Sequence, residues 1–589
     1  MLHVLYGSAT GTAADVAEMV GRMAAARQVP CAVSAMDDFP IASLPSQRYV
    51  VFIVASSGDG EAPENMAQSW KFLLRKSLAA DSLANVRVAI FGLGDSSYAK
   101  YNAVARRLQA RLIQLGATEI VERGLGDDQH ELGFYGALNP WLEKLWGTVL
   151  ALPPFQLPDG FVVDDTPRLT PPQYHVTQVA ATTASSVPHT FYAAPKTVLS
   201  AHNGEILMAT VAANDRLTAA DWTQDVRHLV LDMSSAPVPY APGDIALLYP
   251  ENTDTAAIDR FLHRLGLVRG TQLVISRVDG APASIPSPVS VDDLMRKYLD
   301  IFGTPRRSFF ERLSLFASDP DEREKLLELA SPSGADLLSD YCTREKRTYV
   351  EVFEDFASVA VPLECLVEFI PRLQPRSYSI ASASGTHPSS IELTIALVEF
   401  QTPYKRPKKG ICSAYVASLP VGATLPIWIK AGLFAPPPPN ANVLLIGPGT
   451  GVAVMRALIQ SRAATATATG ETHLFVGCRH AAKDFLYEGE WQTLVSTRSL
   501  TSLHAAFSRD FGYKLYVQAK LAEASAMVFR VLANGGYCFV AGSAKRMPTD
   551  VYEAIRDIVV NEGQVSLKEA ETFMKSLVRH KRYVVESWS

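Results

Sequence analysis

Short apolar runs alternate with amphipathic stretches along the first 130 residues. The runs LHVLYG (2–7), YVVFIVA (49–55) and VRVAIFGLG (86–94) each lead directly into a loop rich in glycine and serine. After the first loop, apolar residues recur at helical spacing from residue 12 to residue 22. Buried strands separated by helices are typical of a doubly wound parallel sheet, which binds ligands at the carboxyl ends of its strands. We expect such a domain over residues 1–147.

The last third of the chain repeats this pattern, whereas the middle does not. NVLLIGPGTGVAVMRALIQ (442–460) predicts a strand, a glycine loop and a helix, and HLFVGCR, KLYVQ and YCFVAG predict further parallel strands within 438–589. Within 203–437, segments such as EILMATVAAN and VRHLVLDM alternate in polarity as barrel strands do. Residues 252–370 have helical periodicity instead, which predicts an all-helical insertion in the barrel.

A proline-rich stretch without clear periodicity separates the first domain from the barrel. It covers residues 148–202 and has Pro-Pro pairs at 153–154 and 171–172. We interpret it as a partly extended tether. Such a tether suits a domain that must reach more than one partner.

Composition agrees with several folded domains. The 589 residues predict three or four domains, and 48% hydrophobic with 20% charged residues fits a folded protein. The net charge is −5, yet residues 440–589 carry 17 basic and 13 acidic side chains. A basic region suits a polyphosphorylated ligand, although scattered surface charge explains the counts equally well.

The six cysteines indicate a reducing compartment. They are widely spaced and form no CxxC pair, which argues against a disulfide framework and against a zinc or iron–sulfur site. No run of about 18 apolar residues is present, and the first loop begins as early as Ser8. We expect a cytosolic protein with no membrane anchor, no bound metal and no nucleic-acid partner.

The loops of the first domain have the composition of an FMN site. SATGTA (8–13) lies between a strand and a helix, where N–H groups and hydroxyls bind a phosphate without a dedicated basic residue. In a later loop, Tyr98 can stack on a flavin ring, and Asp95 with Asn102 can fix the loop. A further acidic turn, GDDQH (126–130), follows a fourth strand, TEIVE.

The motif RSYS (376–379) has the chemistry of an FAD site. Arg376 can pair with the pyrophosphate, Tyr378 can lie against the flavin or ribose, and Ser379 can place a hydroxyl near the hydride-accepting nitrogen. GICS follows about thirty residues later, where we expect Ser413 to cap a helix that faces the same pyrophosphate.

The glycine loop GPGTG (447–451) indicates a pyridine-nucleotide site. NADPH differs from NADH by a ribose phosphate, so its recognition needs cations and hydroxyls. Ser508, Arg509 and Lys514 supply these groups, and Tyr516 can stack on the adenine.

Taken together, these segments resemble the diflavin reductase family across nearly the whole chain. The resemblance implies a multidomain α/β protein: a flavodoxin-like doubly wound sheet, a β-barrel FAD domain with a helical insertion, and a Rossmann-like NADPH-binding domain. The early first loop, the short chain and ASSG (55–58) are most similar to the cytosolic branch that supplies electrons to iron–sulfur protein assembly. In that branch the acceptor is the iron–sulfur protein anamorsin.

The resemblance assigns a cofactor to each group of site residues. FMN is assigned to Ser8, Ala9, Thr10, Gly11, Thr12, Ala13, Ser56, Ser57, Gly58, Asp59, Leu93, Gly94, Asp95, Ser96, Ser97, Tyr98, Ala99, Lys100, Tyr101, Asn102 and Asp128. FAD is assigned to Arg376, Ser377, Tyr378, Ser379, Gly410, Ile411, Cys412, Ser413 and Trp588, with Arg344 as a weaker candidate. NADPH is assigned to Thr450, Ser508, Arg509, Lys514, Leu515, Tyr516, Val517, Gln518 and Asp550.

Three features depart from the family pattern. Ala541 stands where many relatives have a cysteine, Glu586 stands where others have aspartate, and GVAVMR replaces the usual GxAPFR. We expect Ser379, Glu586 and Trp588 to act at the flavin, the first two as polar groups and the indole as a lid.

The implied reaction sequence is electron transfer from NADPH to FAD, then to FMN, then to a one-electron acceptor. The FMN domain would move to reach that acceptor. Two alternatives stay open: a haem protein as the acceptor, or a flavin-binding scaffold with little turnover.

Overall fold

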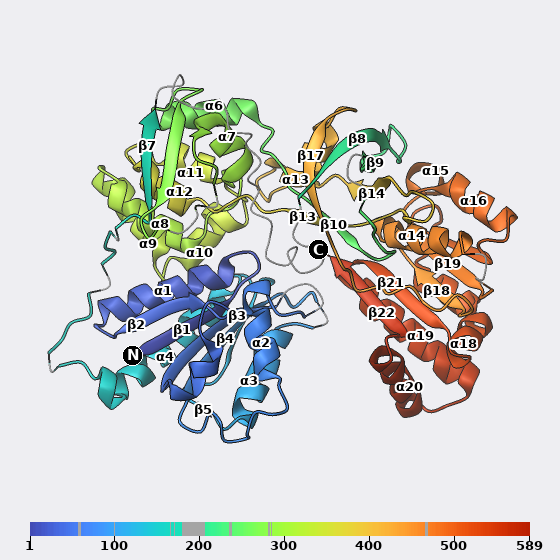
Figure 1. Cartoon of the computed structure of the whole chain (residues 1–589), viewed down its shortest axis with the longest axis horizontal. Coiled ribbons are helices and arrows are strands. Elements are labelled where there is room, and N and C mark those ends of the chain that lie inside the picture. Colours follow the sequence, from blue (N-terminus) through green and yellow to red (C-terminus); the bar gives the residue numbers. More distant parts are fainter. Residues whose placement is uncertain are drawn as a thin grey trace. The chain divides into compact units, whose positions relative to one another are not determined.

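The computed structural model describes residues 1–56, 60–98, 100–158, 160–164, 166–169, 171–179, 206–234, 238–280, 283, 285–465 and 469–588. Its contacts form two compact units, each built from segments far apart in the sequence (Figure 1). The first unit contains Met1–Ala193, Asp254–Gln374 and Gln401–Lys408. The second contains Ala194–Thr253, Pro375–Phe400 and Lys409–Ser589.

The first unit begins with the predicted doubly wound sheet. Its parallel strands have the order β2-β1-β3-β4-β5, with β6 also paired to β4. The strands are β1 (Leu2–Gly7), β2 (Cys31–Ala35), β3 (Tyr49–Ala55), β4 (Arg87–Gly94), β5 (Thr118–Glu119) and β6 (Gly124–Asp127). The helices between and after them are α1 (Thr12–Ala26), α2 (Ala67–Leu73), α3 (Ala103–Gln114) and α4 (Tyr135–Ala151).

Helices on both faces explain why the strands of this sheet are continuously apolar. In β3, Val51 and Ile53 belong to the core formed with α1 and α4, whereas Phe52 and Val54 belong to the core formed with α3. Successive side chains of a strand point to opposite faces, so a strand covered on both sides has no solvent-facing position. The predicted parallel sheet is confirmed.

The insertion completes the first unit and is not all helical, so that part of the prediction is wrong. QLVISR alternates buried Leu273 and Ile275 with exposed Val274 and forms a strand. Its partner β7 lies inside the stretch interpreted as a tether. The strands, in the order β12-β11-β7, are β7 (Tyr174–Val179), β11 (Gln272–Arg277) and β12 (Val289–Ser290). The helices are α6 (Thr255–Arg264), α7 (Val291–Asp293), α8 (Arg307–Leu313), α9 (Pro320–Ala330), α10 (Ala335–Leu338), α11 (Tyr349–Asp355) and α12 (Leu363–Phe369).

The second unit contains a nearly closed, six-stranded antiparallel sheet with the order β13-β10-β17-β8-β9-β14. A bridge between Ile380 and Leu393 links the ends of this order, β13 and β14, across the barrel. The strands are β8 (Leu207–Arg216), β9 (Val226–Asp232), β10 (Ile245–Leu248), β13 (Arg376–Ser379), β14 (Ser390–Ala396) and β17 (Thr424–Lys430). The helix α13 (Ile411–Ser418) packs into its core through Cys412, Tyr415 and Val416. A short two-stranded sheet, β15 (Glu399–Gln401) with β16 (Pro407–Lys409), precedes α13.

The second unit ends in a parallel sheet with the order β20-β19-β18-β21-β22. Its strands are β18 (Val443–Ile446), β19 (Thr472–Cys478), β20 (Ser502–Phe507), β21 (Tyr537–Ser543) and β22 (Tyr583–Trp588). The helices are α14 (Val452–Ala463), α15 (Ala481–Asp484), α16 (Glu488–Ser496), α17 (Val517–Glu523), α18 (Ser525–Ala533), α19 (Met547–Gly563) and α20 (Leu567–Arg579). The strand predicted at KLYVQ is wrong, because Val517 and Leu521 bury one face of a helix at a spacing of four residues.

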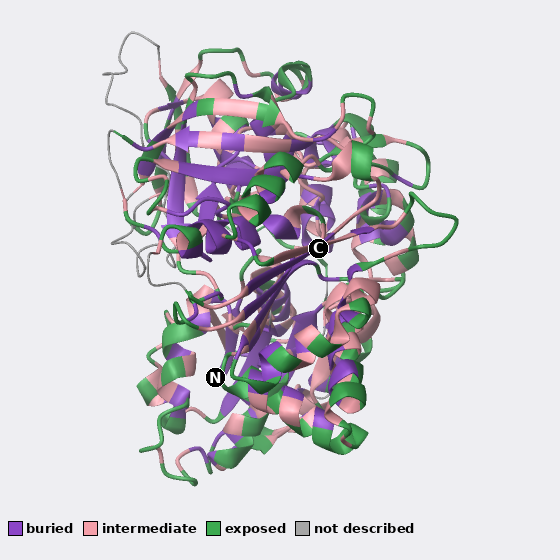
Figure 2. Cartoon of the chain, turned by 90° about the vertical axis from the view of Figure 1, so that its right-hand side faces the viewer, coloured by how far each residue is buried: buried purple, intermediate pink, exposed green. Residues whose placement is uncertain are grey.

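Buried residues concentrate in the strands, while the outward faces of the helices are exposed (Figure 2). Among the helices that the described residues form, none has the length and apolar character needed to cross a membrane.

Candidate functional site

The loops assigned to FMN meet at the carboxyl edge of the first sheet. β1, β3, β4 and β6 are parallel, so the loops that follow them leave the same edge. The backbone links these loops to one another: Ser56 N–H donates to Leu93 O at 2.9 Å, and Asp128 N–H donates to Gly94 O at 2.9 Å. This edge is where doubly wound sheets bind their ligands.

The first of these loops has the geometry of an anion site. Gly11 precedes α1 with φ of 90°, a conformation that favours glycine. Ser8 N–H donates to Asn65 Oδ1 at 2.8 Å, and within the described residues Ser8 Oγ is buried without a hydrogen-bond partner. A buried hydroxyl that has no protein partner, beside the first turn of a 15-residue helix, fits a phosphate group.

The loop after β4 is fixed as the sequence predicts. Asn102 is fully buried with φ of 52°, and its Nδ2 donates to Gly126 O at 2.8 Å. A Cβ on Gly94 would lie 3.0 Å from the Asn102 side chain, which explains the glycine there. Asp95 Oδ1 accepts from Ser97 N–H at 2.8 Å. The proposed loop-fixing roles of Asp95 and Asn102 agree with these contacts.

The remaining FMN candidates differ in how far they are tied to the protein. Tyr101 OH donates to Leu125 O at 3.2 Å, whereas the half-buried Tyr98 stays the predicted stacking residue. The predicted residues Ser57, Gly58, Asp59 and Ala99 lie outside the described residues.

The RSYS motif forms β13, the strand that pairs with β10. Tyr378 lies beside Cys412 of the second FAD motif. Burial, with Cys412 nearby, raises the pKa of Tyr378, and burial raises the pKa of Cys412 to about 11. The fold therefore brings the two motifs together, and both groups stay neutral near pH 7.

The prediction that Ser413 caps α13 is wrong. Gly410 is the residue before the helix, and Ser413 lies within its first turn. Ser413 Oγ accepts from Val398 N–H at 3.1 Å and donates to Gly410 O at 3.1 Å. Ser413 therefore satisfies the backbone N–H of Val398 and positions the turn. A Cβ on Gly410 would lie 2.9 Å from Val398 Cβ, so this close approach requires glycine.

Two of the predicted catalytic residues are in contact. Ser379 Oγ donates to Glu586 Oε2 at 3.2 Å, although 207 positions separate them. Glu586 is 8% exposed and is paired in the sheet with the fully buried Ala541. The third, Trp588, ends β22, where Ala544 N–H donates to its carbonyl at 2.8 Å. Its half-buried indole packs against the core of the last sheet.

The glycine loop of the last sheet packs tightly against a neighbouring strand. Gly449 has φ of 59°, and a Cβ on Gly451 would collide with the carbonyl of Ala541. Thr450 lies between them, half-buried, in the turn that leads into α14. This is the strand–turn–helix geometry that places a dinucleotide at a helix N-terminus.

The residues predicted to bind the ribose phosphate follow β20. Ser508 N–H and Oγ both donate to Cys478 O, at 2.9 and 3.2 Å, and Arg509 N–H donates to Arg479 O at 2.9 Å. Arg509 and Lys514 are exposed, as a ligand contact requires. Arg479, at the end of β19, is a further cation at this edge that the motifs did not indicate.

The other NADPH candidates divide into surface and core residues. Tyr516 is 47% exposed, whereas Val517 is 3% exposed and Leu515 packs beside it in the core. Any contact that Val517 makes with a ligand is therefore through the backbone, whereas the half-buried Leu515 keeps part of its side chain exposed. Gln518 Nε2 donates to Asp550 Oδ2 at 3.4 Å, so these two predicted residues lie together. Arg344 pairs with Asp340 at 2.8 Å in the first unit and stays the weaker candidate.

A buried ionic cluster beside the glycine loop was missed by sequence reasoning. Arg456 is 7% exposed; it donates to Glu490 at 2.7 Å and to Ala381 O at 2.9 Å, and it pairs with Glu392. Burial alone would lower the pKa of Arg456, but Glu490 and Glu392 outweigh burial and raise it. The available signal was an arginine inside the apolar run VAVMRALI.

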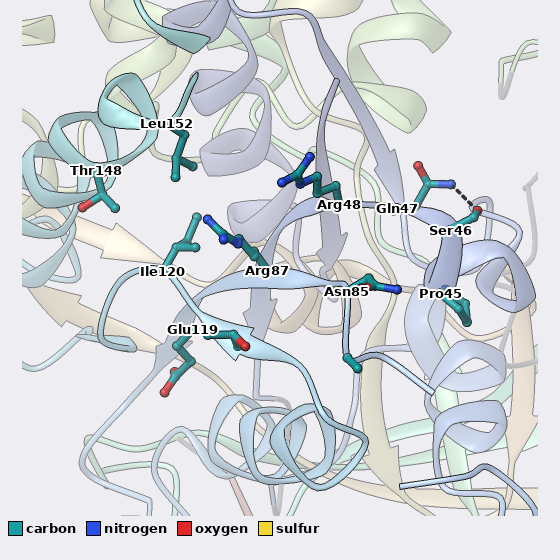
Figure 3. Close-up of a pocket in the computed structure, with 12 residues that line it drawn as sticks. Pro45, Ser46, Gln47, Arg48, Asn85, Arg87, Glu119, Ile120, Thr148 and Leu152 are labelled. Carbon is teal, nitrogen blue, oxygen red and sulfur yellow. Dashed lines mark hydrogen bonds between the residues drawn. The ribbon is translucent and has the colours of Figure 1, made fainter. Parts of the chain in front are cut away.

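A cavity of about 770 Å³ lies at the amino ends of β3, β4 and β5, opposite the edge of this sheet that bears the FMN loops (Figure 3). Arg48, Arg87 and Glu119 line it, together with Gln47, whose Nε2 donates to Ser46 Oγ at 3.1 Å. Because cofactors bind at the opposite, carboxyl ends of these strands, this cavity is not the FMN site.

Known domains match the three regions in the order of their folds. Residues 4–141 match the flavodoxin family, 200–415 match the FAD binding domain, and 445–553 match the oxidoreductase NAD-binding domain. Fold and site therefore define a reductase that uses two flavins and a pyridine nucleotide.

Relatives of similar length narrow this class. The chain is 39% identical to NADPH-dependent diflavin oxidoreductase 1 of Bos taurus, 36% to that of Arabidopsis thaliana and 34% to that of Schizosaccharomyces pombe. Each comparison covers 100% of this chain and 99% of the relative. The chain belongs to the NADPH-dependent diflavin oxidoreductase family, and its cofactors are FMN, FAD and NADPH.

Proposed function

We propose that this reductase passes electrons from NADPH through FAD and FMN to an anamorsin-type iron–sulfur protein, in cytosolic iron–sulfur cluster assembly. The full-length similarity to the diflavin oxidoreductases supports the order of the cofactors. The acceptor is inferred from the resemblance to one branch of the family.

The contact between Ser379 and Glu586 carries the proposal at the reductase end. FAD supplies the chemistry when bound, because a flavin accepts two electrons as a hydride and releases them singly. The buried Glu586 carboxylate stabilises positive charge that develops beside it. The hydroxyl of Ser379, the last residue of β13, holds its proton toward that carboxylate.

Acidic side chains at the FMN edge support a protein acceptor. Asp95, Asp127 and Asp128 gather there, and Asp127 is held by N–H groups of Ser96 and Gln129 at 2.9 and 3.0 Å. A fixed negative rim steers a partner whose cluster lies beneath a basic surface, and it raises the association rate more than the affinity.

The test is anaerobic reduction of purified acceptors. NADPH-reduced protein is mixed in a stopped-flow instrument with an oxidised anamorsin-type protein or with a haem protein, and the absorbance of each acceptor is followed. We expect the iron–sulfur protein to be reduced faster than the haem protein. Its reduction should become slower as salt is added, because salt screens the charges that steer association. Reduction of the haem protein alone would overturn the proposed acceptor.

Ser379→Ala is the matched control, because it lies at the other end of the electron path. It should slow flavin bleaching by NADPH while leaving the step from prereduced protein to acceptor unchanged. A flavin that does not bleach in the unaltered protein would favour the scaffold alternative.

A further inference from the structure

The phosphate loop of the FMN domain contains no cation of its own. SATGTA (8–13) offers hydroxyls and backbone N–H groups only, so its residues predict a phosphate bound without a basic residue. A phosphate monoester near pH 7 carries close to two negative charges. A loop of neutral donors leaves much of that charge to solvent.

The structure places an arginine of the insertion on this loop. Arg306 Nη2 donates to Thr10 O at 2.9 Å, across 296 positions of sequence. Its Nη1 lies 3.4 Å from the point where a Cβ on Gly11 would stand. The guanidinium therefore lies over the two residues that turn the chain into α1. Within the described part of the chain, Arg306 has no carboxylate partner.

A docked helix holds this arginine in place. Arg306 precedes α8, whose first turn contacts α1 and α4 of the FMN domain. Ser308 Oγ donates to Asp15 of α1, and Arg307 Nη1 donates to Asn139 Oδ1 of α4 at 2.8 Å. Arg307 is 7% exposed, so its role is to hold the helix.

A second contact fixes α8 farther along α1. Glu311 of α8 pairs with Arg22 of α1 at 3.1 Å. The helix is therefore tied to the FMN domain at both ends, and Arg306 is the residue of this interface that lies on the ligand loop.

We propose that Arg306 is the cationic ligand of the FMN phosphate, supplied by the insertion. A guanidinium with free donors beside helix N–H groups binds a phosphate through charge-assisted hydrogen bonds. FMN binding and docking of the insertion then stabilise each other, because coupling between two binding events is reciprocal. An FMN domain that leaves the insertion to reach an acceptor gives up this contact. The proposal does not depend on which acceptor is used.

Riboflavin separates a phosphate contact from every other effect, since it has the flavin ring without the phosphate. Full-length protein is stripped of FMN, and binding of FMN and of riboflavin is measured by quenching of flavin fluorescence. Charge-assisted hydrogen bonds of this kind correspond to roughly ten- to a hundredfold in affinity. We expect Arg306→Gln to weaken FMN by about that factor and to leave riboflavin unchanged.

Three further variants make the result decisive. Arg306→Lys keeps the charge and should restore part of the FMN affinity. Arg260→Gln, at an exposed arginine of the same insertion that pairs with Glu354, should change neither flavin. Glu311→Gln loosens the docked helix without touching the loop and should weaken FMN more than riboflavin. Far-ultraviolet circular dichroism and thermal unfolding of the FMN-free protein report whether the first unit, which contains all of these positions, has folded in each variant.

Two outcomes would overturn the proposal. Equal weakening of FMN and riboflavin by Arg306→Gln would mean that the arginine only shapes the loop. Unchanged FMN affinity in a folded variant would mean that the phosphate is bound without it. If Arg306→Gln behaves as expected but Glu311→Gln has no effect, the ligand role stands and the coupling to docking is wrong.

Discussion

Each of the two parallel sheets has a glycine turn that leads into a helix and suits a phosphate. The cations beside the two turns come from different parts of the chain. In each sheet the chain turns from a first strand through glycine into a helix, at Gly11 in one and at Gly449 in the other. In the last sheet the cations Arg479 and Arg509 follow strands of that sheet. In the first sheet the cation, Arg306, comes from an insertion about 300 positions away.

This difference suits what each ligand does. A nicotinamide nucleotide must exchange in every cycle, and a site made from one sheet can bind and release it without rearranging other elements. A flavin stays bound over many cycles, so its site can depend on a second element. The interiors differ as well: apolar cores cover both faces of each sheet, but the last sheet also has a buried ionic cluster around Arg456 beside it.

Removing Arg456 should have the largest effect, and it should lower the stability of the second unit alone. Arg456→Met leaves Glu392 and Glu490 without their cation, and breaking a buried ion pair in this way costs about 3–5 kcal/mol. We expect urea to release FAD at a lower concentration while release of FMN is unchanged. Arg498→Met, at an exposed position of the same domain, is the control. Equal losses in both units would contradict the contrast between their interiors.

Arg509 tests whether the last sheet carries its own phosphate selectivity. Losing one charge-assisted contact costs about 1.5–3 kcal/mol, or roughly ten- to a hundredfold in affinity. Arg509→Ala should raise the KM for NADPH by such a factor and leave the KM for NADH nearly unchanged, in steady-state kinetics with each nucleotide. Similar damage with both nucleotides would point to a structural role for the turn.

The local pattern was enough to predict the two parallel sheets and their loops. Strands buried on both faces are continuously apolar, and β3 and β18 follow that rule. Short segments were harder. KLYVQ contains Leu515 and Val517 at strand spacing, yet both side chains pack where a helix begins. The alternation in QLVISR was hidden among helical segments.

Contacts between distant segments could not be predicted from local pattern. Ser379 and Glu586 were both expected at the flavin from the family resemblance, but their direct contact at 3.2 Å is seen only in the fold. Arg306 carries no signal at all, since it is one basic residue in a helical stretch. Its position depends on how α8 docks on α1, which is a property of tertiary packing.

Trp588 tests a smaller difference between the two ends. We expect a side chain to move aside for the nucleotide at one end, whereas Arg306 holds the FMN phosphate at the other. Its backbone is held as the last residue of β22, so the indole is ordered at a chain position that would otherwise fray. If the indole covers the flavin face where nicotinamide arrives, Trp588→Ala should tighten NADPH and NADH severalfold and slow turnover through slower release of NADP⁺. Unchanged affinity and turnover would show that it is not the lid.

A lower pH should destabilise the second unit more than the first, and we expect this difference to be the smallest of those tested. Burial lowers the pKa of His228, His473 and His504, all in the second unit, whereas among the described residues of the first unit it lowers that of His3 alone. A histidine whose pKa is lower when folded takes up its proton on unfolding, so its stabilising effect is complete above the unfolded value of 6.5 and is lost as pH falls below it. We therefore expect the temperature of FAD release to fall more between pH 7.5 and pH 5.5 than that of FMN release. His473→Gln, which cannot titrate, should reduce that fall, and parallel falls for both flavins would show that these histidines do not set the difference.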